Sequence, residues 1–274
     1  MTRVDEILDD LKKSGFPLEI EVGSLFSNRG WTVRHQAIFK DSGEEPKYVD
    51  LLATKVVEGA FGQYNRVVFM VVCECKKSEK MPWVFYIPGG ALQVPKDLAS
   101  IFHLKILSEP PIGAADRVSL GTKTRHVVRD PQHRLAQASH LAFWQDKAGR
   151  GRGDYNQING AINQVLKAST YQIQSIAKMI PLATGVLMLV IPLIVVDGTL
   201  FEYNLGQDGE PTAKEMSYVK YQATVIGSET TVKLPNERTE KYTPQEDFLI
   251  DIVDKKTLPD YIDWLEEDMK LITS

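Results

Sequence analysis

An acid and a base follow the most apolar of the first three strand-like segments of this sequence. Residues 67–72 are all apolar (VVFMVV), and Glu74 and Lys76 follow directly in the motif Cys73-Glu74-Cys75-Lys76. An unbroken apolar run of this length, bounded by polar residues, indicates a central β-strand buried on both faces. Because alternate strand residues share a face, Glu74 and Lys76 project together from the strand, where packing gives no reason for either.

A second carboxylate, Asp50, lies near the start of the preceding strand-like segment, residues 48–53 (YVDLLA). If the two strands are antiparallel neighbours, Asp50 approaches Glu74, and two close carboxylates repel each other unless a cation lies between them. A cation that prefers oxygen ligands, Mg²⁺ with Mn²⁺ as a substitute, fits this pair. Lys76 would then orient or deprotonate a water, or stabilise charge on a phosphate. The plain alternative is a surface ion pair between Glu74 and Lys76.

These motifs, taken in order, resemble the PD-(D/E)XK nuclease superfamily in its Mrr-like form. Glu19 lies eleven residues before Gly30, as a first-helix glutamate does in that group, and residues 30–33 (GWTV) are similar to the entry of its first strand. Residues 49–53 (VDLLA) resemble its aspartate strand, and residues 72–76 (VCECK) resemble its (D/E)-x-K strand. The resemblance covers about residues 17–77, with a helix and a strand at 155–197.

Two features depart from the family pattern. Val49 occupies the position before Asp50 where the family's nominal motif has proline. Related exonucleases carry a Gln-x-x-x-Tyr element in the following helix, whereas Gln164 and Tyr171 are seven residues apart here.

The resemblance implies an α/β, restriction-endonuclease-like fold: a mixed β-sheet core flanked by helices. It further implies a metal-dependent nuclease that hydrolyses phosphodiester bonds, with DNA as the favoured substrate. Asp50 and Glu74, helped by the main-chain carbonyl of Cys75, would hold Mg²⁺, Lys76 would position the attacking water, and Glu19 would complete the site. The alternatives are a member that kept the fold and lost the chemistry, or a non-catalytic module that binds nucleic acid or protein.

Periodicity places the elements that must position these residues. We expect a single domain, residues 1–274, with a core at about 1–83 and 155–226, an insertion at about 84–154 and a C-terminal strand–helix extension at about 227–274. In the second helix, which starts at Pro17, Glu19 and Glu21 flank the apolar stripe about equally, so both compete for the site and either is otherwise a solvated residue. The expected elements are helices at 4–11, 17–30, 130–149, 155–180 and 259–272, and strands at 31–39, 48–57, 66–76, 187–196, 199–203, 218–226 and 248–253, with a turn at Asp197-Gly198.

The net charge of −4 gives no global argument for a nucleic-acid partner, so the distribution of charge decides. Basic residues outnumber acidic ones in the insertion, which suits a phosphate backbone. The alternative is an ordinary solvated surface, with residues 149–153 as a flexible linker. The predicted nucleic-acid contacts are Arg125, Arg129, Arg134, Arg150 and Arg152.

Cys73 and Cys75 are the only cysteines, and their spacing within one strand suits two small buried side chains better than a disulfide. This use of cysteine fits a reducing compartment. Residues 182–196 are too few to span a bilayer and contain Pro192, so we expect a cytoplasmic protein without a membrane partner. A homodimer, and a protein partner docked on the acidic C-terminal helix, stay open.

Overall fold

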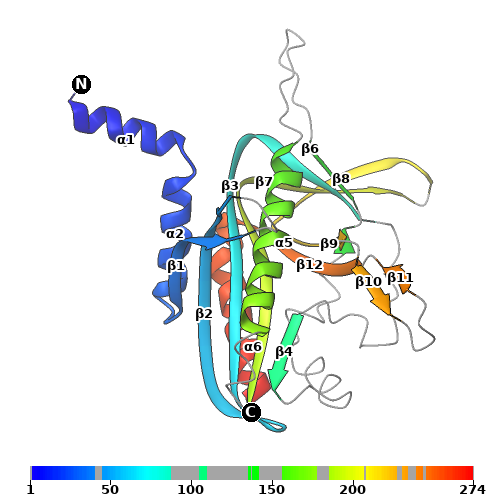
Figure 1. Cartoon of the computed structure of the whole chain (residues 1–274). Helices are drawn as coiled ribbons and strands as arrows, with labels where there is room; N and C mark the ends of the chain where they lie inside the picture. Colours follow the sequence, from blue (N-terminus) through cyan, green and yellow to red (C-terminus); the bar gives the residue numbers. More distant parts are fainter. Residues whose placement is uncertain are drawn as a thin grey trace.

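The structure is an α/β arrangement in which a mixed sheet is flanked by helices, as the computed structural model shows (Figure 1). This confirms the expected class. The residues that the structure describes are 2–40, 45–87, 105–109, 135–136, 138–141, 156–177, 185–206, 208–226, 230–233, 239–242 and 245–273.

The first half of the chain builds two helices and an antiparallel meander. Each strand pairs with the next, β1 with β2 and β2 with β3, so the expected antiparallel pairing of the two acid-bearing strands is confirmed. The strand that carries Glu74 does not end at Lys76, because it continues for ten more residues. These elements are α1 (Arg3–Lys13), α2 (Phe16–Ser27), β1 (Thr32–Phe39), β2 (Lys47–Phe61) and β3 (Tyr64–Tyr86).

The second half extends the sheet from β3. Strand β7 runs parallel to β3 along nearly its whole length, β12 runs parallel to β7, and β9 is antiparallel to β12. The resulting order is β1-β2-β3-β7-β12-β9-β5, with β4 and β8 paired to β7 and β6 paired to β3, while β10 and β11 form a separate pair. The bounds are β4 (Lys105–Glu109), β5 (Leu135–Ala136), β6 (Ala138–Leu141), α5 (Asn156–Ala177), β7 (Val186–Leu205), β8 (Pro211–Met216), β9 (Tyr218–Ile226), β10 (Thr230–Lys233), β11 (Thr239–Tyr242), β12 (Gln245–Asp254) and α6 (Leu258–Thr273).

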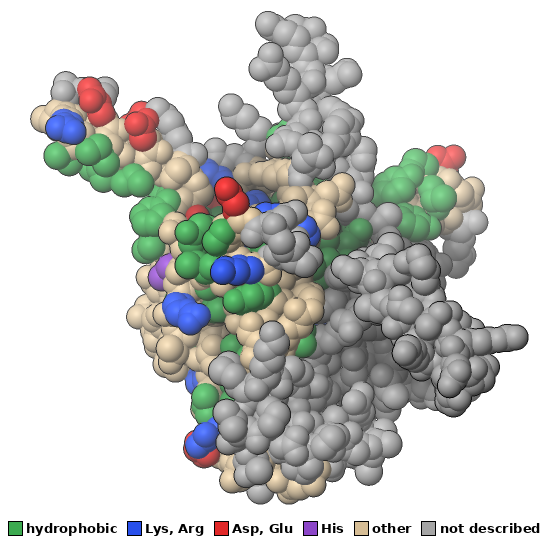
Figure 2. All heavy atoms as spheres, in the orientation of Figure 1, with side chains coloured by type: hydrophobic (Ala, Val, Ile, Leu, Met, Phe, Trp, Pro, Cys, Tyr) green, Lys and Arg blue, Asp and Glu red, His purple; other side chains and the backbone are tan. Residues whose placement is uncertain are grey.

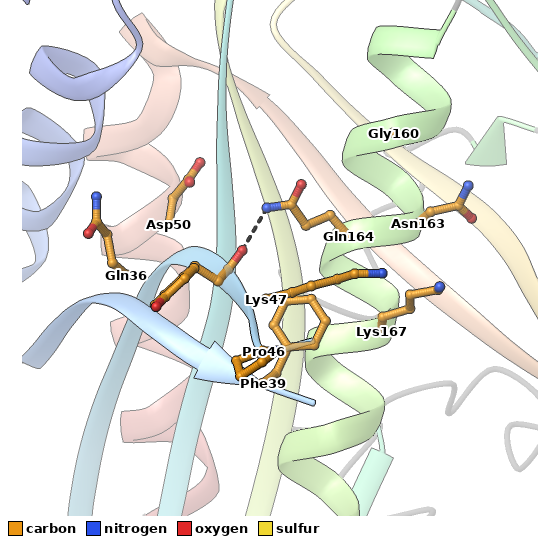
Figure 3. A pocket seen from close by; sticks show the side chains of 10 residues that line it. Gln36, Phe39, Pro46, Lys47, Asp50, Gly160, Asn163, Gln164 and Lys167 are labelled. Carbon is orange, nitrogen blue, oxygen red and sulfur yellow. Dashed lines mark hydrogen bonds between the residues drawn. The ribbon is translucent and has the colours of Figure 1, made fainter. Parts of the chain in front are cut away.

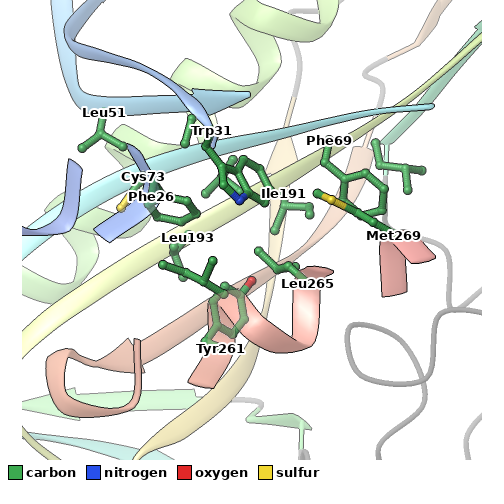
Figure 4. Close-up of a cluster of buried hydrophobic side chains, with 14 of the residues drawn as sticks. Phe26, Trp31, Leu51, Phe69, Cys73, Ile191, Leu193, Tyr261, Leu265 and Met269 are labelled. Carbon is green, nitrogen blue, oxygen red and sulfur yellow. The ribbon is translucent and has the colours of Figure 1, made fainter. Parts of the chain in front are cut away.

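Each face of the sheet carries its own hydrophobic core. On one face α2 and α6 cover the strands, where Phe26 and Trp31 meet edge to face and Tyr261 and Leu265 pack below them (Figure 4). On the other face α5 buries the apolar side that includes Ile158, Ile162 and Val165. Because both faces are covered, β3 is buried on both sides, as its apolar run indicates.

Two of the expected local structures are wrong. Asp197-Gly198 forms no hairpin turn, because β7 runs straight through it. A Cβ at Gly198 would lie 2.7 Å from the Ser78 carbonyl oxygen, so this glycine permits the close approach of β3 and β7 instead of a turn. The helix expected at 130–149 is also wrong where the chain is described, since β5 and β6 are strands there. Asp130, its proposed cap, lies outside the described residues.

The C-terminal residues are integral to the fold. Strand β12 lies inside the sheet between β7 and β9, and α6 packs in the core under α2. In β12, the buried Asp251 accepts hydrogen bonds from the hydroxyls of Tyr218 and Tyr261, both at 2.6 Å, and from the Lys220 ammonium. An acidic side chain of α6 makes contacts within the chain: Glu266 accepts a hydrogen bond from Trp31 Nε1 and forms an ion pair with Lys55.

Helix α1 projects from the body and leaves its apolar side uncovered within the described chain. An apolar stripe follows α1 and continues onto α2 (Figure 2): Val4, Ile7, Leu8, Leu11, Phe16 and Ile20. None of the described helices has the length and apolar character that crossing a membrane requires.

Candidate active site

Asp50 and Glu74 lie opposite each other at the point where the β2–β3 ladder stops. The antiparallel register runs to the pair Leu51–Cys73, so the next position would join Asp50 to Glu74. Directly opposite residues of an antiparallel pair share a sheet face. Instead of a backbone pair, the Asp50 carboxylate accepts a hydrogen bond from the Cys75 backbone N–H, with 2.7 Å between nitrogen and Oδ2. The two carboxylates are thereby brought to one point from two strands.

Glu74 is the most deeply buried member of this group. Its side chain is fully buried, because β3 is covered by β2 on one edge, by β7 on the other and by α5 above. Burial, with the Asp50 charge beside it, raises the pKa of Glu74 from its ordinary 4.5 to about 7. Burial also raises the pKa of Asp50, while the Cys75 hydrogen bond and the Lys76 charge act in the opposite direction.

Lys76 forms an ion pair with Glu74 on the same strand face, as their spacing predicts. The ammonium contacts Glu74 Oε1, and the lysine side chain remains 25% exposed. Burial opposes the charged form of Lys76, but the Glu74 and Asp50 carboxylates together outweigh this and raise the pKa of the lysine. Lys76 therefore stays cationic while it reaches from the buried acid to the surface of the site.

The structure separates the two candidate glutamates of α2. Burial and then the Asp50 charge raise the pKa of Glu19, while the Lys76 charge lowers it, so the charges of the site act on Glu19. Glu21 instead forms an ion pair with Lys255 at 2.7 Å, away from Asp50 and Glu74. Of the two glutamates of α2, Glu19 is therefore the one that interacts electrostatically with Asp50 and Lys76, while Glu21 is paired with Lys255.

The donor set suits a hard cation in its chemistry, since oxygen atoms of Asp50 and Glu74 meet there. Glu74 Oε2 is buried and makes no hydrogen bond with the described residues, which is costly for a carboxylate oxygen. A divalent cation would give that oxygen a partner. Within the described part of the chain, however, no group of three or more His, Cys, Asp and Glu side chains is arranged as a metal site. A cation here would be coordinated by two carboxylates and a main-chain oxygen.

Two contacts that the sequence did not suggest hold the end of this strand segment. Gln157, in the first turn of α5, donates from Nε2 to the Lys77 carbonyl oxygen at 3.0 Å. The Lys77 ammonium donates to the Lys12 carbonyl oxygen of α1 at 2.9 Å. The Gln157 contact fixes the backbone just after Lys76, whereas the Lys77 contact only ties a side chain to the end of α1. A lone glutamine near the start of a helix gives no sequence signal for such a role.

A cleft opens beside Asp50, between β1, β2 and α5 (Figure 3). It is lined by Gln36, Lys47, Asn163, Gln164 and Lys167, none of which is among the site residues predicted from the sequence. Their only sequence signal is that Lys47 comes three residues before Asp50 and that the α5 residues fall on one exposed helical face. The arginines proposed to contact nucleic acid, Arg125, Arg129, Arg134, Arg150 and Arg152, lie outside the described residues.

Comparisons of this chain with protein-family models, with curated proteins and with solved structures find no match.

Proposed function

We propose that this protein is a divalent-metal-dependent nuclease with a restriction-endonuclease-like fold, acting on DNA. The element order supports this fold: a helix, the antiparallel meander β1–β3, the helix α5, and then β7 parallel to β3. The sequence resemblance to the PD-(D/E)XK superfamily covers these same elements. Under this proposal the site consists of Asp50, Glu74 and Lys76, with Glu19 beside them.

One observation carries the proposal: the strands β2 and β3 stop pairing where their acids meet. Asp50 bonds to the backbone at Cys75, and Glu74 is held by Lys76, so both carboxylates are fixed by the fold. A buried acid pair that repels and keeps an unpartnered oxygen is unfavourable unless it has a use. Strongly perturbed carboxylates beside a cleft are characteristic of functional sites.

The side chains divide the chemistry among themselves. Asp50 and Glu74, with the Cys75 carbonyl, would hold Mg²⁺, which when bound polarises a phosphodiester and lowers the pKa of water. Lys76, which remains cationic, orients the attacking water and stabilises the negative charge that develops on the phosphate. Glu19, from α2, completes the acidic side of the site.

The test compares neighbouring lysines of β3. Lys76→Ala should lower metal-dependent cleavage of DNA by about 10²–10⁴-fold, the contribution typical of a group that acts in the chemical step. Lys77→Ala is the matched control, because its ammonium contacts α1 and not Glu74, and it should cleave within a few-fold of wild type. Single-stranded, duplex and branched DNA are assayed with Mg²⁺ and with Mn²⁺.

Asp50→Asn separates the metal from the lysine. Loss of the Asp50 carboxylate should weaken metal binding, so excess Mn²⁺ should restore part of the cleavage by Asp50→Asn. Excess metal should not restore cleavage by Lys76→Ala. Equal cleavage by wild type and Lys76→Ala would show that the chemistry lies elsewhere. Circular dichroism of each variant controls for folding, since Lys76 lies outside the apolar run.

A non-catalytic module on the same fold is the second candidate. It is favoured by the lack, among the described residues, of a metal-binding group of three or more side chains. A module would show no Mg²⁺- or Mn²⁺-dependent rise in thermal stability and no cleavage, while still binding its partner. The nuclease should show a rise that Asp50→Asn reduces.

A further inference from the structure

The cleft beside Asp50 has a volume of about 690 Å³ and two different walls. One wall is the β1–β2 edge, which supplies Gln36 and Lys47, and the other is the exposed face of α5, which supplies Asn163, Gln164 and Lys167. In Figure 3, Asp50 and Gln36 lie at one end of this cleft, while the Lys47 and Lys167 side chains extend toward the other. The cleft therefore leads away from the acid pair toward two ammonium groups.

The lining chemistry favours an anion with several hydrogen-bond acceptors. The charged side chains on the cleft wall are two lysines and one acid, Asp50, and the acid lies at the same end as Gln36. Three amide side chains add neutral donors between them. Two aromatic residues also border the cleft: Phe39, which is fully buried, and Tyr48, which is about half exposed. Lysine and amide donors are typical of contacts to phosphate and sugar.

The walls are held at a fixed separation. Gln164 Nε2 donates to the Tyr48 carbonyl oxygen at 2.7 Å, which ties α5 to the start of β2 between Lys47 and Asp50. Beneath this contact Val165 and Leu166 anchor α5 on the sheet. A cleft that is formed before the ligand arrives loses less entropy on binding.

The backbone at Gln36 adds an independent sign of a specialised surface. Gln36 is the one described non-glycine residue with a left-handed conformation, φ 47°, and the β1–β2 ladder skips it where it would face Asp50. Such a conformation costs on the order of 1 kcal/mol or more and is found where function requires it. It places an amide side chain at the Asp50 end of the cleft, as Figure 3 shows.

We propose that this cleft binds the DNA backbone next to the reacting phosphate, with Lys47 and Lys167 contacting neighbouring phosphates and Gln36 contacting the nucleotide beside Asp50. This assignment rests on the proposed nuclease function, because Asp50 marks the reacting end. From Gly160 to Lys167 the cleft follows seven residues of α5, which is roughly 10 Å of helix. Phosphates of one strand are spaced about 3.4 Å along the duplex axis, so two or three of them fit.

The test measures DNA binding by the double variant K47Q/K167Q without divalent metal, so that cleavage does not interfere. The probe is a fluorescein-labelled 20-mer, single-stranded or duplex, titrated at several salt concentrations. Affinity should fall roughly tenfold or more at low salt. The slope of log K against log salt should become shallower by about 1.8 for duplex and about 1.4 for single-stranded DNA, for two lost phosphate contacts. K214Q, an exposed lysine on β8, is the matched control and should bind as wild type.

A methylphosphonate scan locates the contact. Replacing single phosphates by neutral methylphosphonates should weaken wild-type and K214Q binding at one or two adjacent positions, while K47Q/K167Q should lose nothing more there. An unchanged affinity and salt slope in K47Q/K167Q would overturn the cleft assignment, as would a methylphosphonate profile identical to that of wild type. Exclusive binding of an RNA 20-mer of the same sequence would overturn the assignment to DNA.

The two proposals fail separately. If Lys76→Ala loses cleavage while K47Q/K167Q binds and cleaves as wild type, the nuclease proposal holds and the cleft proposal is overturned. If wild type binds neither DNA nor RNA in any of these forms, both are overturned together.

Discussion

Replacing the buried Glu74 with glutamine should stabilise the metal-free protein at alkaline pH while removing its response to metal. The substitution keeps the size and shape of the side chain, and its amide oxygen can still accept from Lys76. It removes a charge that is fully buried and repelled by Asp50. The cost of that charge is present only while no cation balances it.

The magnitude follows from the pKa of Glu74, which burial raises from 4.5 to about 7. The folded protein then binds the proton more tightly than the unfolded chain, so stability is fully present below pH 4.5 and is lost as pH rises through 7. At about 1.36 kcal/mol for each pH unit, the ionised carboxylate costs about 3 kcal/mol at pH 8. The neutral amide loses part of the attraction to Lys76, so we expect a net gain of about 1–2 kcal/mol.

Thermal unfolding at pH 5 and pH 8 checks this, without metal and with Mn²⁺. Metal-free Glu74→Gln should melt about 2–8 °C above wild type at pH 8, given about 2–4 °C per kcal/mol for a domain of this size, and the difference should nearly vanish at pH 5. Mn²⁺ should raise the melting temperature of wild type but not of the variant. Glu215→Gln, an exposed acid on β8, should match wild type throughout. The reasoning fails if Glu74→Gln is no more stable than wild type at pH 8.

Two further predictions concern the fold that positions the site. Leu265→Ala should lower the free energy of unfolding by about 2–5 kcal/mol, because this residue is fully buried between α6 and the sheet, whereas Leu8→Ala on the exposed side of α1 should change it by only about 0.5 kcal/mol in urea titrations. Gly198→Ala should cost about 1–3 kcal/mol, since the new Cβ would meet the Ser78 carbonyl; an unchanged urea midpoint would show that β7 shifts freely there.

The meander and its acids follow from local patterns in the sequence. The apolar run before Glu74 predicts a central strand, and alternation puts Lys76 beside it, because both inferences need only the pleat of a strand. The pattern could not choose between Glu19 and Glu21, since both flank the same helical stripe. That choice depends on Lys255, which comes from the far end of the chain and pairs with Glu21.

Features that depend on distant contacts were missed. Asp197-Gly198 has the composition of a turn, but a glycine is needed there because a Cβ at Gly198 would clash with the Ser78 carbonyl, some 120 residues earlier. The length of β3 beyond Lys76 was also missed, because four polar residues, 77–80, interrupt the apolar pattern before Trp83, where β3 pairs with both β6 and β7. The cleft lysines lie on two elements that only the tertiary fold brings together.

The parallel pairing of β3 with β7 also means that β3 lacks one of its partner strands while the chain is being synthesised. Arg66 pairs with Val186, that is 186 − 66 = 120 positions later. A ribosome that adds about 5–20 residues per second needs roughly 6–24 s to cover that interval. During this time the apolar strand β3 can pair along only one of its edges. An emerging chain of this kind is a natural client for chaperones that bind apolar segments, and a transcript truncated before β7 would yield an aggregation-prone fragment.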